Sequence, residues 1–457
     1  MTIQLIRSIV LTLFCAALIS CGGGTEGESG MPAEPAASGE SEMSGESEMS
    51  GMPAESDGSP AIDLAITNAR VFAATGDDVM EGATILIAGD RIESVSASEV
   101  DVEAAQTIDA AGKTVMPGLI DGHVHVFFDL REGPNFPRND AQAVEFTDGF
   151  MAELLESYLD NGYTSILSPI DFWPQIIDVR ARAESGDLRS PRLFIAGGVF
   201  VAPGGHYVCR ALEGEEQSWC DEHVSVVVDS AEAARAGVRD YAEQGVDLIV
   251  YDSRTNAPEF QTDVVAGLVE EADAQGLRIL VHGSNMANVE AMVAAGIDGF
   301  VHPPADTQDM DGSLAALAGE NGIPVAITIG EQEEEILSGN ASDAARASYE
   351  IMHANVAHLL EAGAVPIFAS DMPGAGPERT RPIVVRAMTG FGLSSAEVLR
   401  AATRDAAQAY IGQADLGTIE AGQLADIIIV DGDPLADLGA LENVDTVIKG
   451  GEVVVSR

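Results

Sequence analysis

The alternation of short apolar runs with helix-length amphipathic segments, between Met116 and about Gly412, constrains the fold more than any other feature. Eight apolar runs of strand length are present, at 117–126, 163–170, 192–201, 246–252, 278–283, 299–303, 324–329 and 365–371. Amphipathic stretches separate them, among them 146–160, 229–243, 261–276 and 341–363. Repeated strand–helix units build a parallel sheet covered by helices. Eight units in one domain predict a (β/α)8 barrel over 117–412, with its chemistry at the carboxyl ends of the strands.

The segments on either side of this region have a different pattern. Over 61–116, short alternating apolar runs such as Thr84 to Ile87 are separated by Gly-Asp and Asn turn signals. The same pattern returns over 413–457. Alternation with a period of two residues is typical of half-buried β-strands. We therefore expect a small β-sandwich built from both chain termini, beside the barrel, in a protein of the α/β class.

The first 60 residues differ again from the rest. Arg7 precedes an apolar run from Ile9 to Ile19, which ends in Ser20-Cys21. This pattern predicts a signal peptide over 1–20, and the small residue before Cys21 resembles the cleavage site of bacterial lipoproteins. Residues 21–60, rich in Gly, Ser and Glu, predict a flexible linker after a lipidated Cys21. The expected location is the bacterial cell envelope, periplasm or outer membrane; an ordinary signal peptide with an incidental cysteine is the alternative.

The formal charge of −51 limits the partners. Residues 61–457 alone hold 65 acidic and 22 basic residues, so the folded part is itself acidic. Such a field repels nucleic acid and anionic lipid. We expect no nucleic-acid partner, a membrane contact through the N-terminal lipid only, and a small-molecule substrate. A homo-oligomer remains open.

Cysteine usage agrees with export. Cys15 would leave with the signal peptide and Cys21 would carry the lipid, so that only Cys209 and Cys220 remain. In an oxidising compartment these two are expected to form a disulfide, which typically contributes about 2–4 kcal/mol to stability. A thiolate metal site is the weaker alternative.

Five polar residues fall at or near the ends of the predicted barrel strands. His123 and His125 are two residues apart, so both imidazoles point to the same face of an extended strand. His282 and His302 end the fifth and sixth strands, and Asp371 ends the eighth. On its own the His123–His125 pair could be two packed histidines. Together, four of the chain's eight histidines and a late aspartate predict a metal site at the rim.

From about Ile62 to its end, the chain resembles the amidohydrolase superfamily, in particular its imidazolonepropionase-like and prolidase-like branch. The resemblance rests on 117–126, on 197–206, and on the segment from Leu416 to Pro434. It implies that the more buried metal is held by His123, His125 and Asp371. A second metal or the attacking water would be held by His282 and His302.

One departure from this pattern concerns the fourth strand. Many relatives bridge two metals with a carboxylated lysine there, but here Val250 occupies that position. The chain's only lysines, Lys113 and Lys449, lie outside the barrel, which excludes a lysine-bridged pair of metals. The favoured reading is one divalent ion, with Zn²⁺ the first choice, on His123, His125, His282 and Asp371. A carboxylate bridge from Asp252 and a weakened site are the alternatives.

The resemblance also suggests catalytic and substrate-binding roles. Asp371 would take a proton from the attacking water and pass it to the leaving nitrogen, while His302 hydrogen-bonds the water or the developing oxyanion. His206 lies in a Gly-rich loop that resembles the family's substrate loop. Further candidates for substrate contact lie near predicted strand ends, although surface or packing roles remain open for each: Tyr251, Arg254, Arg379 and Arg381.

Three functional hypotheses follow. The first is hydrolysis of an amide bond in a dipeptide, an N-acyl amino acid or a cyclic amide. The second, favoured by the missing lysine, is hydrolytic deamination or imidazolone-type ring opening at a mononuclear site. The third is a catalytically silent surface lipoprotein, which the five retained ligand-type residues argue against.

Overall fold

The computed structural model describes residues 61–100, 103–127, 137–204, 206–210, 212–253, 261–282, 286–305, 308–309 and 312–457. The expected signal peptide, the lipidated Cys21 and the linker lie outside these residues, and so does Arg254. Over the described ranges, none of the helices combines the length and the apolar character that crossing a bilayer requires.

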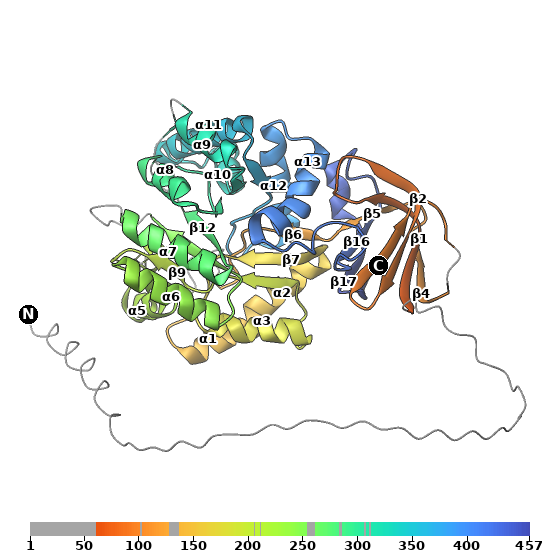
Figure 1. The fold of residues 1–457 in the computed structure, drawn as a ribbon, viewed down its shortest axis with the longest axis horizontal. Helices are drawn as coiled ribbons and strands as arrows, with labels where there is room; N and C mark the ends of the chain where they lie inside the picture. Colours follow the sequence, from red (N-terminus) through yellow and green to blue (C-terminus); the bar gives the residue numbers. More distant parts are fainter. Residues whose placement is uncertain are drawn as a thin grey trace, which may run out of the picture. The chain divides into compact units, whose positions relative to one another are not determined.

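Strands from both ends of the folded region form one continuous sheet of eight strands (Figure 1). They are β1 (Ile62–Phe72), β2 (Val79–Ala88), β3 (Arg91–Ser96), β4 (Ala104–Asp109), β5 (Thr114–Pro117), β16 (Ile427–Val430), β17 (Val444–Lys449) and β18 (Glu452–Ser456). The order is β18-β17-β16-β5-β1-β2-β3, with β4 also paired to β1. The antiparallel pairing of β5 with β16, Met116 opposite Ile428, joins the two ends. Ile66, Ile85 and Ile427 share one apolar core, which explains why remote segments assemble here.

The eight predicted barrel strands are all present, and neighbouring strands pair in parallel. They are β6 (Leu119–Asp121), β7 (Tyr163–Ser168), β8 (Arg192–Ile195) with β9 (Val199–Val201), β11 (Leu248–Asp252), β12 (Arg278–His282), β13 (Gly299–Phe300), β14 (Pro324–Ala326) and β15 (Val365–Ile367). Their assigned pairings form two sheets, β6-β7-β8 and β10-β9-β11-β12-β13-β14-β15. Backbone hydrogen bonds join these sheets at both edges, from Asp247 N to Ile195 O and from Gly122 N to Phe368 O, each 2.9 Å. The ring of strands is therefore closed.

The third barrel strand is interrupted between β8 and β9. Gly197 has a φ of +73°, and a Cβ there would lie 2.6 Å from the ring of Trp173. Glycine is therefore required at this bend. A short strand that the sequence pattern did not predict, β10 (Ser225–Val227), pairs in parallel with β9.

The helices surround the strands (Figure 1). The α-helices are α1 (Asp140–Phe146), α2 (Ala152–Asp160), α3 (Gln175–Ser185), α4 (Tyr207–Arg210), α5 (Gly214–His223), α6 (Ala231–Glu243), α7 (Thr262–Gln275), α8 (Met286–Ala295), α9 (Ser313–Glu320), α10 (Gly330–Leu337), α11 (Asp343–Ala362), α12 (Pro377–Gly390) and α13 (Ser395–Ala401). The segments η1 (Thr147–Met151) and η2 (Asp405–Ile411) are π-helical, and η3 (Leu438–Glu442) is a 3₁₀-helix. Apolar helix faces, such as Ala234, Val238 and Tyr241 of α6, bury against the barrel core.

A partly buried ion pair ties the barrel to the terminal sheet. Arg192 of β8 donates from Nε and Nη2 to the two carboxylate oxygens of Asp426, at 2.7 and 2.9 Å. The Asp426 side chain is only 1% exposed and also accepts the backbone N–H of Gly450 at 2.8 Å. Removing the arginine would leave this carboxylate buried with much of its compensating charge lost.

We therefore expect Arg192→Ala to lower the free energy of unfolding by about 3 kcal/mol. Urea denaturation, followed by far-ultraviolet circular dichroism, measures it. Arg235→Ala is the matched control, because Arg235 pairs with Glu270 at the surface, where the two side chains are 36% and 69% exposed. That change should cost less than about 1 kcal/mol. Equal losses in the two variants would contradict a structural role for the Arg192–Asp426 pair.

Candidate functional site

The predicted ligands of strands one and eight meet where the barrel closes. His123 and His125 follow β6 directly, and Asp371 follows β15. The backbone N–H of Asp371 donates to the carbonyl of His123 at 2.9 Å. Gly122 permits this approach, because a Cβ there would lie 2.7 Å from the side chain of Ile367. The closing contact thus fixes the distance between the two ligand-bearing segments.

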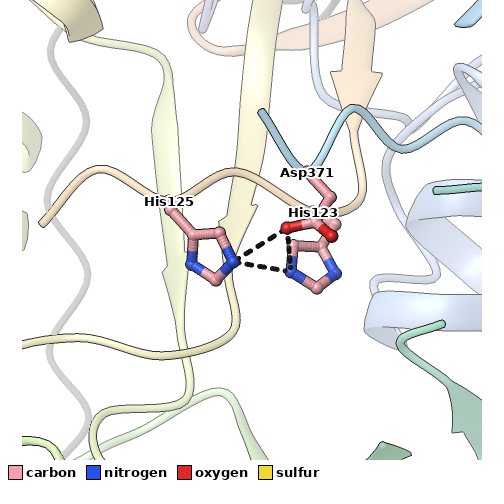
Figure 2. A group of neighbouring side chains, drawn as sticks. All are labelled: His123, His125 and Asp371. Carbon is pink, nitrogen blue, oxygen red and sulfur yellow. Dashed lines mark hydrogen bonds and ion pairs between the residues drawn. The ribbon is translucent and has the colours of Figure 1, made fainter. Parts of the chain in front are cut away.

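The side chains of these three residues point toward a common centre (Figure 2). The Nε2 atoms of His123 and His125 are 3.1 Å apart. Asp371 Oδ1 lies 3.3 Å from the Nε2 of His123 and 2.9 Å from that of His125. The potential ligand atoms of all three lie within 4.8 Å of one another. Two imidazole nitrogens and a carboxylate oxygen so arranged suit a tetrahedral divalent cation.

The surroundings of His123 fix the nitrogen that faces this centre. Its Nδ1 lies 3.0 Å from the carbonyl oxygen of Val301, which can only accept a hydrogen bond. A neutral His123 therefore carries its ring proton on Nδ1 and presents the lone pair of Nε2 to a cation at the centre. This is the tautomer that a metal ligand needs, so the residues fit the cation that the donor set implies.

Asp371 is held in an unusual backbone conformation, with a φ of +48°. A non-glycine residue in the left-handed region is uncommon, and such residues concentrate at functional sites. Burial raises the pKa of its carboxyl group, but the nearby imidazoles of His123, His302 and His125 more than offset this effect and hold the pKa well below its usual range. The carboxylate is consequently ionised and available to a cation.

Sequence reasoning missed Asp121, which orders both ligand-bearing segments. Its Oδ1 accepts the backbone N–H of His123 at 3.1 Å and that of Ser370 at 3.0 Å. Burial raises the pKa of Asp121 to about 7, although these hydrogen bonds lower it. The signal was available, since an aspartate stands two residues before the histidine pair in an otherwise apolar strand.

The structure also brings His282 and His302 to this rim. His302 Nδ1 lies 3.3 Å from Asp371 Oδ2 and 2.8 Å from the hydroxyl oxygen of Thr328. The ring centre of His302 lies 4.6 Å from that of His123 and 4.0 Å from that of His282. All five residues singled out in the sequence are therefore neighbours at the carboxyl ends of the strands.

Asp252 and His206 form a separate pair. His206 Nε2 lies 3.1 Å from Asp252 Oδ2, and both side chains are almost fully buried. The three-ligand group identified among the described residues consists of His123, His125 and Asp371, without Asp252. The contact with His206 therefore does not favour Asp252 as a bridge between two metals.

Three of the residues expected to contact the substrate have other neighbours in the structure. Tyr251 is 2% exposed and belongs to the apolar core, because alternation along β11 turns it away from the side of Val250 and Asp252. Arg381 is buried and donates to the carbonyl of Asn161 at 3.0 Å. Arg379 lies 3.8 Å from Glu334, on the exposed side of α12. Their roles in substrate binding stay predictions, and Arg254 lies outside the described residues.

Cys209 and Cys220 are joined by a disulfide, with their Cα atoms 5.3 Å apart. The bond connects α4 to α5, just after the loop that carries His206. The other histidines have structural contacts: His223 stacks on Trp219, His353 lies against Phe391, and His358 Nδ1 is 3.1 Å from the carbonyl oxygen of Asp309.

Comparisons with known proteins agree with this arrangement. The model of the Amidohydrolase family matches residues 114–454. An imidazolonepropionase of Symbiobacterium thermophilum is 25% identical over 390 residues, which cover 77% of this chain and 84% of that protein. Two crystal structures share the fold at lower identity. A Xaa-Pro dipeptidase with bound methionine is 23% identical, with a TM-score of 0.73 and coverage of 85% of this chain and 99% of that one. The ochratoxinase of A. niger is 22% identical, with a TM-score of 0.74 and coverage of 87% and 96%.

The fold, the rim site and these similarities define a metal-dependent hydrolase that acts on carbon–nitrogen bonds. The chain belongs to the amidohydrolase family.

The geometry predicts that the purified protein binds a divalent cation at this cluster, and Zn²⁺ serves as the test ion. His123→Ala should weaken zinc affinity at least 10-fold, because it removes one of the two facing imidazoles. Equilibrium dialysis with elemental analysis measures the bound zinc and its affinity. His353→Ala is the control, since this histidine packs against Tyr349 and Phe391 outside the cluster. Equal metal content in all three proteins at limiting zinc would refute the assignment.

Proposed function

We propose that this protein hydrolyses an amide bond of a small substrate, such as a dipeptide, an N-acyl amino acid or a cyclic amide. The observation that carries the proposal is the position of Asp371 between two groups of histidines. Its Oδ1 faces His123 and His125, while its Oδ2 faces His302. One carboxylate can thus contact both a cation and the reacting molecules.

The cation is proposed to be a single Zn²⁺ held by His123, His125, His282 and Asp371. When bound, such an ion makes water more acidic and polarises a substrate carbonyl. A single ion agrees with the fourth strand, where the buried Val250 offers no ligand atom and Asp252 is paired with His206.

The proton path in this proposal uses Asp371 and His302. Asp371 accepts a proton from the attacking water and delivers it to the leaving nitrogen, which breaks the carbon–nitrogen bond. His302 hydrogen-bonds the oxygen on which negative charge develops. The hydroxyl of Thr328, 2.8 Å from His302 Nδ1, orients this ring.

A second candidate is the hydrolytic opening of an imidazolone-type ring, or a related deamination. It is supported by the similarity to imidazolonepropionases and by the absence of a lysine from the fourth strand. Product analysis separates the candidates: amino acids from dipeptides, a ring-opened acid from an imidazolone, or ammonia from a deaminated base.

The third hypothesis, a silent surface lipoprotein, has little support. Four imidazoles and a carboxylate meet at one rim, and membership of a hydrolase family argues for catalysis. A lipid anchor is compatible with enzymatic activity. We propose that the hydrolase is anchored in the cell envelope through a lipid on Cys21.

Asp371→Asn tests the chemistry. The amide cannot accept the proton, so kcat should fall roughly 10²- to 10⁴-fold. The measurement is hydrolysis of a library of dipeptides and N-acetyl amino acids by zinc-reconstituted protein. Asp273→Asn, at an exposed position in the last turn of α7, should retain full activity. Undiminished turnover in Asp371→Asn would remove Asp371 from its assigned role.

Cys21→Ser tests the location. In a bacterial host, the variant should move from the detergent-extracted membrane fraction to the soluble envelope fraction, because it offers no thiol for the lipid. Immunoblots of the two fractions measure this shift. Cys15→Ser, inside the predicted signal peptide, should leave the protein in the membrane fraction. Membrane retention of Cys21→Ser would reject lipid anchoring at this residue.

A further inference from the structure

The pair formed by His206 and Asp252 is a second buried polar contact at the carboxyl ends of the strands. The distance between Nε2 and Oδ2 is 3.1 Å, and the side chains are 1% and 2% exposed. Burying a carboxylate is costly unless it is hydrogen-bonded or paired with a positive group. A contact maintained at this cost calls for an explanation in terms of packing, metal binding or substrate binding.

Strand register places the pair next to the ligand cluster. Asp252 pairs with Val201 of β9 on one side and with His282 of β12 on the other. Paired residues on neighbouring parallel strands point their side chains to the same face, about 4.8 Å apart. Asp252 therefore points to the same side as His282, whose ring lies 4.0 Å from that of His302.

The backbone around His206 is restrained independently of Asp252. The hydroxyl oxygen of Ser225 accepts the backbone N–H of His206 at 3.1 Å. Three residues later, Cys209 is bonded to Cys220. These contacts hold the loop but leave rotation of the imidazole undetermined. The contact between Asp252 Oδ2 and Nε2, which are 3.1 Å apart, restrains that rotation.

We propose that Asp252 is a positioning residue, which holds the His206 imidazole so that the ring hydrogen-bonds the substrate beside the metal centre. This inference rests on the proposed hydrolase function. The fourth strand thus contributes through His206, and not as the metal bridge for which the lysine of relatives is used. Asp252 touches His206, and His206 touches the substrate.

A double-mutant cycle on the full-length, zinc-loaded protein tests the proposal. His206→Ala and Asp252→Ala should each lower kcat/KM about 10- to 100-fold, mainly through KM. The double variant should have about the same kcat/KM as the less active single variant, because both substitutions disrupt the same His206–Asp252 contact. Asp252→Asn should retain most of the activity, because the amide keeps the size of the side chain and its contact with the His206 ring. X-Pro dipeptides and N-acetyl amino acids serve as the substrate probes.

Asp171→Asn is the matched control. Asp171 is likewise a fully buried aspartate just past a barrel strand, but it accepts a hydrogen bond from Ser168 at 2.7 Å. This variant should keep the wild-type kcat and KM. If it loses as much as Asp252→Ala, loss of a buried carboxylate alone explains the effect, and the proposal fails.

Two further readouts separate the alternatives. Zinc content should stay at the wild-type value in Asp252→Ala, and a loss of metal would show that Asp252 is a ligand instead. Nitrogen-15 spectra of the histidine rings, with the His206 signal assigned from His206→Ala, should shift in Asp252→Ala. An unchanged His206 signal would overturn the positioning role, even if no probe is hydrolysed and the proposed function has failed.

Additive losses in the double variant would also overturn the proposal, because they would show that the two residues act separately. Thermal unfolding identifies variants that have lost their fold. For any such protein, the milder pair His206→Asn and Asp252→Val replaces the alanine variants in the cycle. A purely structural pair would lower the midpoint of unfolding without changing KM.

Discussion

The contact that closes the barrel is the one on which the site depends. The first and last strands meet through hydrogen bonds from Gly122 N to Phe368 O and from Asp371 N to His123 O. Because the second of these bonds joins two ligand residues directly, closure of the ring also brings the two ligand-bearing segments together. Asp121 strengthens it by accepting an N–H from each segment. If the first and last strands did not meet, Asp371 would not lie beside His123 and His125.

Much of the fold was readable from the sequence, for a specific reason. All eight strands lie within their expected ranges, because buried parallel strands are nearly continuous apolar runs that polar loops interrupt. The convergence of His123, His282, His302 and Asp371 followed from counting strands. The sequence pattern did not reveal the break after β8 or the short strand β10. The break depends on Trp173 packing against Gly197, a contact that no local pattern records.

Contacts between side chains could not be predicted by counting strands. Counting placed Asp252 at the rim, but it could not show that the His206 ring lies 3.1 Å from its carboxylate. It placed Tyr251 at the same strand end, although the alternation along β11 turns this ring into the core. Position along a strand gives the height of a residue in the barrel. Which residue contacts it depends on the loop that folds over the carboxyl ends of the strands.

The buried aspartates show how partners give one residue type several roles. Asp371 is kept ionised by three imidazoles, and Asp426 is neutralised by a guanidinium. Asp121 has only backbone N–H groups and a hydroxyl to offset its burial, so its pKa rises to about 7. In all three, most partners come from remote parts of the chain, Ser370 being 249 residues from Asp121. An acidic chain can bury such groups only where the fold delivers a matching partner, so the partner decides which aspartate binds a cation and which supports the structure.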